Sequence, residues 1–201
     1  MARKKAYEEK IVKLIFIKEG IYDLEEDLLI TCPISIHGAG QTNTIIQGKG
    51  IVIEGTKEGK KRVNMKDMTM KGSSGDGLYA DDGLSFLCKD MTFTQCESGV
   101  YAYNTKGRLI NCVITQCGWS GIVCQNRALI EVEGDQTKVD GNVASGHRTC
   151  YGLKTLYTSS IIHLLFPLTK DSVSTNNLGG GNHGNSRYGT SVGTIQTVES
   201  F

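Results

Sequence analysis

The chain has 201 residues, with 22 basic and 21 acidic side chains, a formal net charge of +1, 25 glycines and two prolines. This length suits a single domain, residues 1–201, and the balanced charge excludes a general attraction to nucleic acid or to an anionic membrane. No run approaches the roughly 18 consecutive apolar residues that a membrane-spanning helix needs, so we expect no membrane partner.

The cysteines and the start of the chain bear on location. Seven cysteines is an odd number, no CxxC pair occurs, and Cys96 and Cys117 recur at matched positions in TQCESG and TQCGWSG. We interpret these two as small apolar core residues, with a metal or disulfide role as the alternative. The polar segment 1–11 lacks the apolar stretch of a secretory signal. We therefore expect a cytoplasmic or otherwise intracellular protein, or a secreted one if the N-terminus is truncated.

The first quarter of the chain, residues 13–53, alternates apolar and polar residues in short runs. Glycine-containing turns such as HGAGQTN and QGKG separate these runs. Alternation with a period of two, broken by small-residue turns, predicts short β-strands rather than helices.

A repeat of 22 residues organises residues 63–126. Glycine recurs at 77, 99 and 121, and an Asp or Asn recurs at 82, 104 and 126. A fixed period of this length with β-type alternation inside each unit is typical of a stacked solenoid. Because Asn tolerates unusual backbone angles, we interpret the Asp82, Asn104 and Asn126 column as a turn-forming ladder.

The strand that closes each repeat has one apolar side. In GLYADD, Leu78 and Ala80 are predicted to face inward, with Tyr79 and Asp81 facing outward. The same alternation in GVYAYN and GIVCQN places these residues outside: Tyr101, Tyr103, Val123 and Gln125. Since stacked strands lie about 4.8 Å apart, Tyr79 and Tyr101 should lie one above the other.

The last third of the chain predicts more strands and two loops. Residues 128–142 and 152–177 read as strand material, and 193–198 as a final strand that seals one end. A loop is expected to bulge from the solenoid around residues 143–152. Residues 178–189 are rich in glycine and asparagine, without periodic apolar residues, and are predicted to form a loop.

The stretch IFIKEGIYDLEEDLLITCPISIHGAGQTNTIIQG carries a family resemblance. Its G-x-Y, I-x-G-x-G and T-x-I-x-G steps resemble the first turn of the pectin-lyase-like, right-handed parallel β-helix superfamily. The later repeats resemble its generic carbohydrate-binding and sugar-hydrolase repeats, so the likeness covers roughly residues 12–175. The resemblance implies an all-β, single-stranded right-handed parallel β-helix of about seven coils.

Enzymes of the superfamily act on polysaccharides, and the chain matches their motifs only in part. The polygalacturonase pattern implies Asp76 in SGDG and Glu97 in CESG as acids, followed by His147 and Lys154. The paired aspartates, the second glycine after His147 and the final arginine of that pattern are missing. The alternative is that Asp76 and Glu97 are solvated turn residues.

A pectate-lyase site would need calcium, the one cofactor that the resemblance implies. Asp81 and Asp82 are the adjacent acid pair in the middle of the solenoid, but the lyase strings W-I-D-H and R-x-P-x-x-R are absent. Neighbouring repeats offer Tyr103 and Gln125 where further acids would be needed, and calcium prefers six to eight oxygen ligands. The sequence therefore predicts no cofactor and no metal-binding residues.

An outward aromatic stripe is the remaining candidate site, formed by Tyr79, Tyr101 and Tyr103, with Trp119 in a nearby turn. Such rings stack on sugars or anchor a protein partner, although aromatic residues are also common on the outside of strands. We expect a non-enzymatic scaffold or binding module for a glycan or protein surface. The alternative is a glycoside hydrolase or polysaccharide lyase that uses Asp76, Asp81 and Glu97. Homo-oligomers through the solenoid ends or faces are a third expectation, because solenoid ends expose strand edges.

Overall fold

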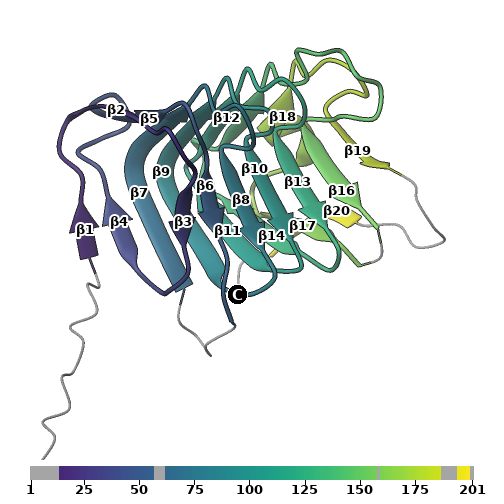
Figure 1. The fold of residues 1–201 in the computed structure, drawn as a ribbon. Helices are drawn as coiled ribbons and strands as arrows, with labels where there is room; N and C mark the ends of the chain where they lie inside the picture. The colour runs from purple at the N-terminus through teal and green to yellow at the C-terminus, as the bar shows by residue number, and fades with distance from the viewer. Residues whose placement is uncertain (1–13, 57–61, 158, 187–193, 200–201) are drawn as a thin grey trace, which may run out of the picture.

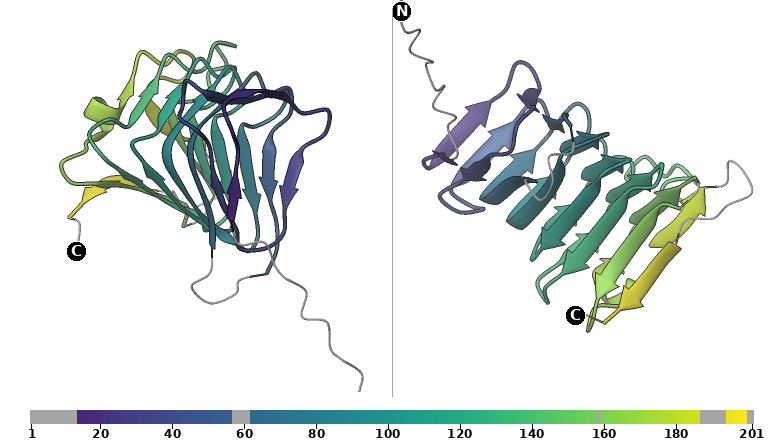
Figure 2. Two further views of the ribbon diagram at one scale, coloured as in Figure 1. Left: turned by 90° about the vertical axis from the view of Figure 1, so that its left-hand side faces the viewer. Right: turned by 90° about the horizontal axis from the view of Figure 1, so that it is seen from below.

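The computed structural model describes residues 14–56, 62–157, 159–186 and 194–199. Within them the chain winds into a right-handed parallel β-helix whose coils stack along one axis (Figures 1 and 2). The predicted all-β solenoid is confirmed. The polar segment 1–11 lies outside the described residues.

Sheet B forms one face of the solenoid. Its seven strands are joined in parallel, one from each successive coil, which agrees with the expected number of coils. These strands are β3 (Leu28–Ile30), β6 (Ile51–Ile53), β8 (Leu78–Asp81), β10 (Val100–Tyr103), β13 (Ile122–Gln125), β16 (Leu153–Leu156) and β19 (His183–Ser186).

Sheet A, with 13 strands, covers the remaining faces and bends in the middle. Its main path is β1 (Leu14–Phe16), β4 (Ser35–His37), β7 (Arg62–Lys71), β9 (Ser85–Thr94), β11 (Lys106–Ile110), β14 (Leu129–Glu133), β17 (Ile161–Leu165) and β20 (Thr194–Val198). Beyond the bend lie β2 (Gly20–Asp23), β5 (Thr44–Gln47), β12 (Val113–Thr115), β15 (Lys138–Asp140) and β18 (Ser174–Thr175). The long strands β7 and β9 cross the bend and belong to both halves.

The ladder predicted at the end of the repeat is confirmed. Asp82, Asn104 and Asn126 have φ values of 25°, 45° and 52°, in or near the left-handed region that most side chains avoid. Asn104 Nδ2 donates a hydrogen bond of 2.5 Å to Asp82 Oδ1 on the neighbouring coil. The column therefore turns the chain at the end of each sheet-B strand and links successive coils.

The core is a set of stacked apolar columns inside the coils. Leu78, Val100 and Ile122 follow one another in register and are fully buried. Cys96 and Cys117 are buried and carry free thiols, which confirms them as core residues. Burial of these columns is the main contribution to stability, because no coil can hide its apolar face alone.

The last coils correct the sequence-based assignment. The segment 178–189, expected as a loop, contains β19, which pairs with β16 through its backbone. The strand was missed because backbone pairing needs no periodic apolar side chains. Glycine at position 184 also lets β19 lie close to Tyr151, since a Cβ there would lie 2.3 Å from Tyr151 Cε1. The helix α1 (Lys170–Val173) was not predicted, although Thr169 and Ser172 form its capping box. No helix in the described ranges is long and apolar enough to cross a membrane.

Candidate functional site

The outer side of sheet B brings together most of the residues that the sequence singled out. We call this surface the sheet-B face. It consists of outward side chains on β8, β10, β13 and β16 and of the turns that precede these strands: Asp76, Tyr79, Asp81, Glu97, Ser98, Tyr101, Tyr103, Trp119, Val123, Gln125 and Lys154.

Two tyrosines lie at the centre of the sheet-B face. Tyr79 pairs in register with Tyr101 on the next coil, and their rings meet edge to face with centroids 5.4 Å apart. Tyr101 donates its hydroxyl hydrogen to Gln125 Oε1, which fixes the ring from the other side. Burial is the first cause that raises the pKa of both phenols, so both stay protonated at neutral pH. The stacked pair that the repeat predicted is confirmed.

Asp76 lies in the turn before β8, at the edge of the sheet-B face. Burial raises the pKa of its carboxyl group to about 6, and the negative charge of Glu97 adds to this rise. Hydrogen bonds from the hydroxyl and the backbone N–H of Ser98 act in the opposite direction. Asp76 is therefore half-buried and hydrogen-bonded, unlike the freely solvated turn residue that was the alternative.

The acids Asp76 and Glu97 come from neighbouring coils and lie in adjacent rows. The N–H of Glu97 donates to Gly75 O at 2.8 Å, and the N–H of Trp119 donates to Glu97 O at 2.7 Å. Gly75, Glu97 and Trp119 thus form one row, while Asp76 lies one residue further along its own coil. The Glu97 side chain is exposed.

A loop from a later coil reaches the same edge. The N–H groups of Ala144 and Ser145 donate to Cys117 O and Gly118 O, at 3.2 and 2.9 Å. These bonds hold the loop so that the His147 ring stacks on the Trp119 ring, with centroids 6.2 Å apart and planes 5° from parallel. Trp119 nevertheless stays 50% exposed. The row that carries Glu97 therefore includes a half-exposed indole ring.

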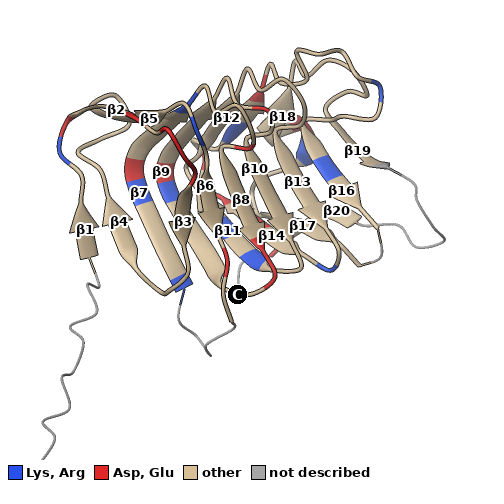
Figure 3. Cartoon of the chain, in the orientation of Figure 1, with Lys and Arg blue, Asp and Glu red and all other residues tan. Residues whose placement is uncertain are grey.

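The far end of the sheet-B face is apolar and basic. Val123 has the outward register predicted for it but is 2% exposed, because its in-register neighbours Tyr101 and Lys154 have long side chains that cover it. Burial is the first cause that lowers the pKa of Lys154. Figure 3 shows this basic band on β16, while β8, β10 and β13 carry none.

Asp81 and Asp82 do not form the calcium site that a lyase would need. Asp81 faces outward on β8, where Tyr103 and Gln125 are its in-register neighbours, and Asp82 is a member of the turn ladder. Among the described residues, no group of three His, Cys, Asp or Glu side chains is arranged to hold a metal ion. These residues do not fit calcium.

Sequence reasoning missed the position of Ser98 and the proximity of His147 to Trp119. The Ser98 signal was present, since Asp76, Ser98 and Ser120 each precede a repeat glycine. No spacing rule would have placed His147, because its position depends on a ten-residue loop that is held by backbone contacts with another coil, among them those with Cys117 and Gly118.

Comparison with known proteins identifies the fold. A family profile described as a right-handed beta helix region matches residues 49–182, about two thirds of the chain. The chain belongs to the right-handed β-helix family. Among solved structures, this β-helix is similar to the catalytic domain of a GH87 alpha-1,3-glucanase in complex with tetrasaccharides. The TM-score is 0.49 at 13% identity, and the alignment covers 86% of this chain and 35% of that one. No curated protein sequence matches the β-helix.

Proposed function

We propose that the sheet-B face binds a polysaccharide chain, with its aromatic rings against the sugar rings. The observation that carries this proposal is the in-register pair Tyr79 and Tyr101, whose rings are 5.4 Å apart on a rigid sheet. Aromatic faces stack on the C–H surfaces of sugars, while phenolic and indole groups bond to hydroxyls. Trp119, half exposed in the row of Gly75 and Glu97, adds an aromatic ring in the turns before these strands.

The charges of the sheet-B face favour a neutral or amino-sugar chain over a uronic acid chain. The sheet-B face carries three carboxyl groups, those of Asp76, Asp81 and Glu97, and one basic side chain, that of Lys154. An anionic chain would meet these like charges on the face, which costs binding free energy.

Titration with soluble polysaccharides tests this proposal. Tyr79→Ala and Trp119→Ala should each weaken binding of a soluble β-glucan or arabinoxylan about tenfold, because each removes a stacking surface. Phe16→Ala is the matched control, since Phe16 is 63% exposed on β1, away from the sheet-B face. Equal losses in all three variants, or binding of polygalacturonate in preference to neutral chains, would refute the proposal.

A second candidate function is hydrolysis of the bound chain, and Asp76 is the observation that favours it. A carboxyl group with a pKa of about 6 retains part of its proton near neutral pH, as a general acid requires. Glu97 on the neighbouring coil would be the second carboxylate, acting as base or nucleophile across the glycosidic bond.

Reducing-end assays separate the two candidates. If the β-helix is a hydrolase, Asp76→Asn and Glu97→Gln should each abolish release of reducing ends while binding in the titration persists. Glu19→Gln, which changes an exposed acid in the turn before β2 and outside the sheet-B face, should leave the rate unchanged. Absence of release from β-glucan, xylan and chitosan between pH 4 and 8 would leave binding as the function and eliminate hydrolysis.

A further inference from the structure

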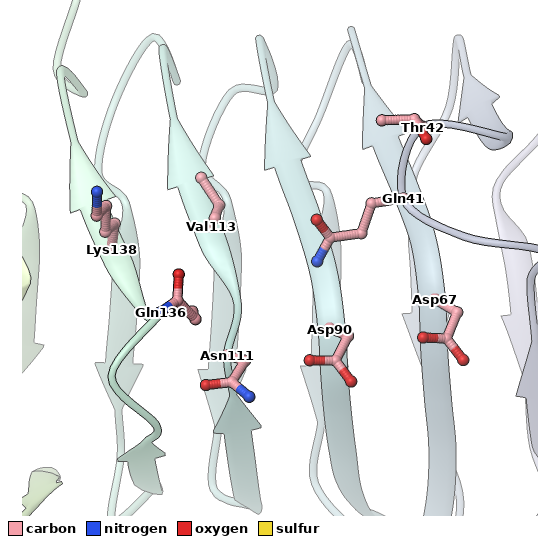
Figure 4. Close-up of a pocket in the computed structure, with 8 residues that line it drawn as sticks. All are labelled: Gln41, Thr42, Asp67, Asp90, Asn111, Val113, Gln136 and Lys138. Carbon is pink, nitrogen blue, oxygen red and sulfur yellow. The ribbon is translucent and has the colours of Figure 1, made fainter.

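A groove lies on sheet A, at the bend between its two halves. The groove encloses about 520 Å³, within the range of small-ligand pockets. Figure 4 shows its floor on successive coils: Asp67, Asp90 and Asn111. Among the eight lining residues Val113 is the one apolar side chain. Most of the lining side chains are therefore polar, and the groove is separate from the sheet-B face.

The floor is a ladder with one side chain from each of three successive coils. Asp67, Asp90 and Asn111 have φ values of 59°, 49° and 51°, so each bends the chain in the left-handed region, the first two within β7 and β9 and the third between β11 and β12. Identical backbone geometry on stacked coils presents three side chains in one line, at steps of about 4.8 Å. Such a line of acceptors and donors suits a linear ligand that lies along the solenoid axis.

The wall on the N-terminal side is held in place by backbone contacts. The N–H of Gly40 donates to Asp67 O at 2.9 Å, and the hydroxyl of Thr69 donates to Gln41 O at 2.7 Å. These bonds use the backbone of Gln41 and leave its side chain over the groove, where Figure 4 shows it extending past β7 toward β9. The wall is preformed, which lowers the entropic cost of binding.

The opposite wall is built in the same way. The N–H of Thr137 donates to Gly134 O and the N–H of Lys138 donates to Cys112 O, both at 3.0 Å. This turn presents the exposed side chains of Gln136 and Lys138 to the groove. At its foot, Asn111 Oδ1 is buried and has no hydrogen-bond partner among the described residues. The wall therefore offers a ligand the exposed amide of Gln136 and the ammonium group of Lys138.

The charges of the groove indicate what kind of ligand it takes. Lys66 Nζ lies 3.1 Å from Asp67 Oδ2 and Lys89 Nζ lies 4.0 Å from Asp90 Oδ2, so both floor carboxylates have a cation beside them. Figure 3 shows these alternating bands on β7 and β9. Lys138 adds a further positive charge. A field so nearly balanced favours neither a polycation nor a polyanion.

We infer that the groove formed by Asp67, Asp90, Asn111, Gln41, Gln136 and Lys138 is a second carbohydrate-binding site, which takes a neutral oligosaccharide lying along the solenoid axis. Carboxylate and amide groups in line bond to the paired hydroxyls of sugars, and the side-chain amides of the two walls close over them. This inference does not rest on the function proposed for the sheet-B face, because it uses none of the same residues.

Amide-resolved NMR and titration with laminarihexaose, cellohexaose and xylohexaose test the inference. At least one of these neutral sugars should shift the backbone signals of Asp67, Asp90 and Asn111. The double variant Gln41→Ala, Gln136→Ala should weaken that interaction about tenfold, because it removes two hydrogen-bonding amides. Asp67→Gly, Asp90→Gly should do the same without backbone strain, since glycine accepts positive φ. Gln196→Ala, an exposed amide on β20, is the matched control.

The outcomes separate the two sites. In the double variant Tyr79→Ala, Trp119→Ala, the sugar should still shift the backbone signals of the groove but no longer those of the sheet-B face. This result supports the inference whether or not the sheet-B face binds a polysaccharide. The inference is overturned if none of the three sugars shifts the groove signals. It is also overturned if chitosan hexaose or hexagalacturonate binds the groove more tightly than the neutral sugars, or if the groove variants bind like Gln196→Ala.

Discussion

The Asp76 carboxylate accepts two hydrogen bonds from Ser98 on the next coil, one from the hydroxyl and one from the backbone N–H. These bonds favour the charged form, yet burial outweighs them and raises the pKa to about 6. Burial thus sets the pKa of this carboxyl group at the edge of the sheet-B face, and the contact with the next coil limits the rise.

The raised pKa of Asp76 predicts how stability changes with pH. The folded state binds the proton more tightly than the unfolded chain, whose value is near 3.8, so this group destabilises the fold as pH rises through the window from about 4 to 6. The difference between these two pKa values corresponds to about 3 kcal/mol. The variant Asp76→Asn should not show this decrease in the free energy of unfolding. Urea unfolding of both proteins at pH 4 and 7 measures it, and identical pH slopes would contradict the prediction.

Gly107 should not tolerate a side chain. A Cβ at this position would lie 2.2 Å from Cζ of Phe86, which is buried on the neighbouring coil and cannot move aside. Gly107→Ala should lower the free energy of unfolding by about 2 kcal/mol. Gly75→Ala is the control, because a Cβ there meets nothing within 4 Å. Thermal or urea unfolding compares the two, and equal midpoints would show that the coils can separate at no cost.

Asn142 connects the start of the loop 143–152 to the preceding coil through its side chain. Its buried side chain accepts from the N–H of Cys117 and donates to Ile114 O, each at 3.0 Å. Asn142→Ala leaves those groups without partners and should cost about 3 kcal/mol of unfolding free energy. Asn64→Ala, on the outer side of β7, should change it by less than about 0.5 kcal/mol. Chemical denaturation measures both, and a loss in Asn64→Ala as large as that in Asn142→Ala would argue against the fastening role.

Substitutions at Tyr79 can separate stacking from hydrogen bonding on the sheet-B face. If the ring carries the interaction, Tyr79→Phe should keep glycan affinity within about twofold, while Tyr79→Leu should lose about tenfold. Titration with the same soluble β-glucan provides both values. The reverse order, with Phe as weak as Leu, would assign the affinity to the hydroxyl group.

The sequence by itself determined the stack. A period of 22 residues places Gly77, Gly99 and Gly121 at one level of successive coils, and alternation within each unit separates core from surface. The sequence of a single repeat is enough to predict these features, because each coil repeats the same backbone path and adds to the same buried columns. For this reason the aromatic pair Tyr79 and Tyr101 could be placed in advance.

The tertiary structure decided what the sequence left open. The stacking of His147 on Trp119, the burial of Val123, the pKa of Asp76 and the groove on sheet A all depend on contacts between coils or between a loop and a distant coil. Periodicity fixes the height of a residue along the axis but not which loop folds back over it or how deeply a neighbour buries it. Those outcomes depend on packing, and packing is set only when all coils are in place.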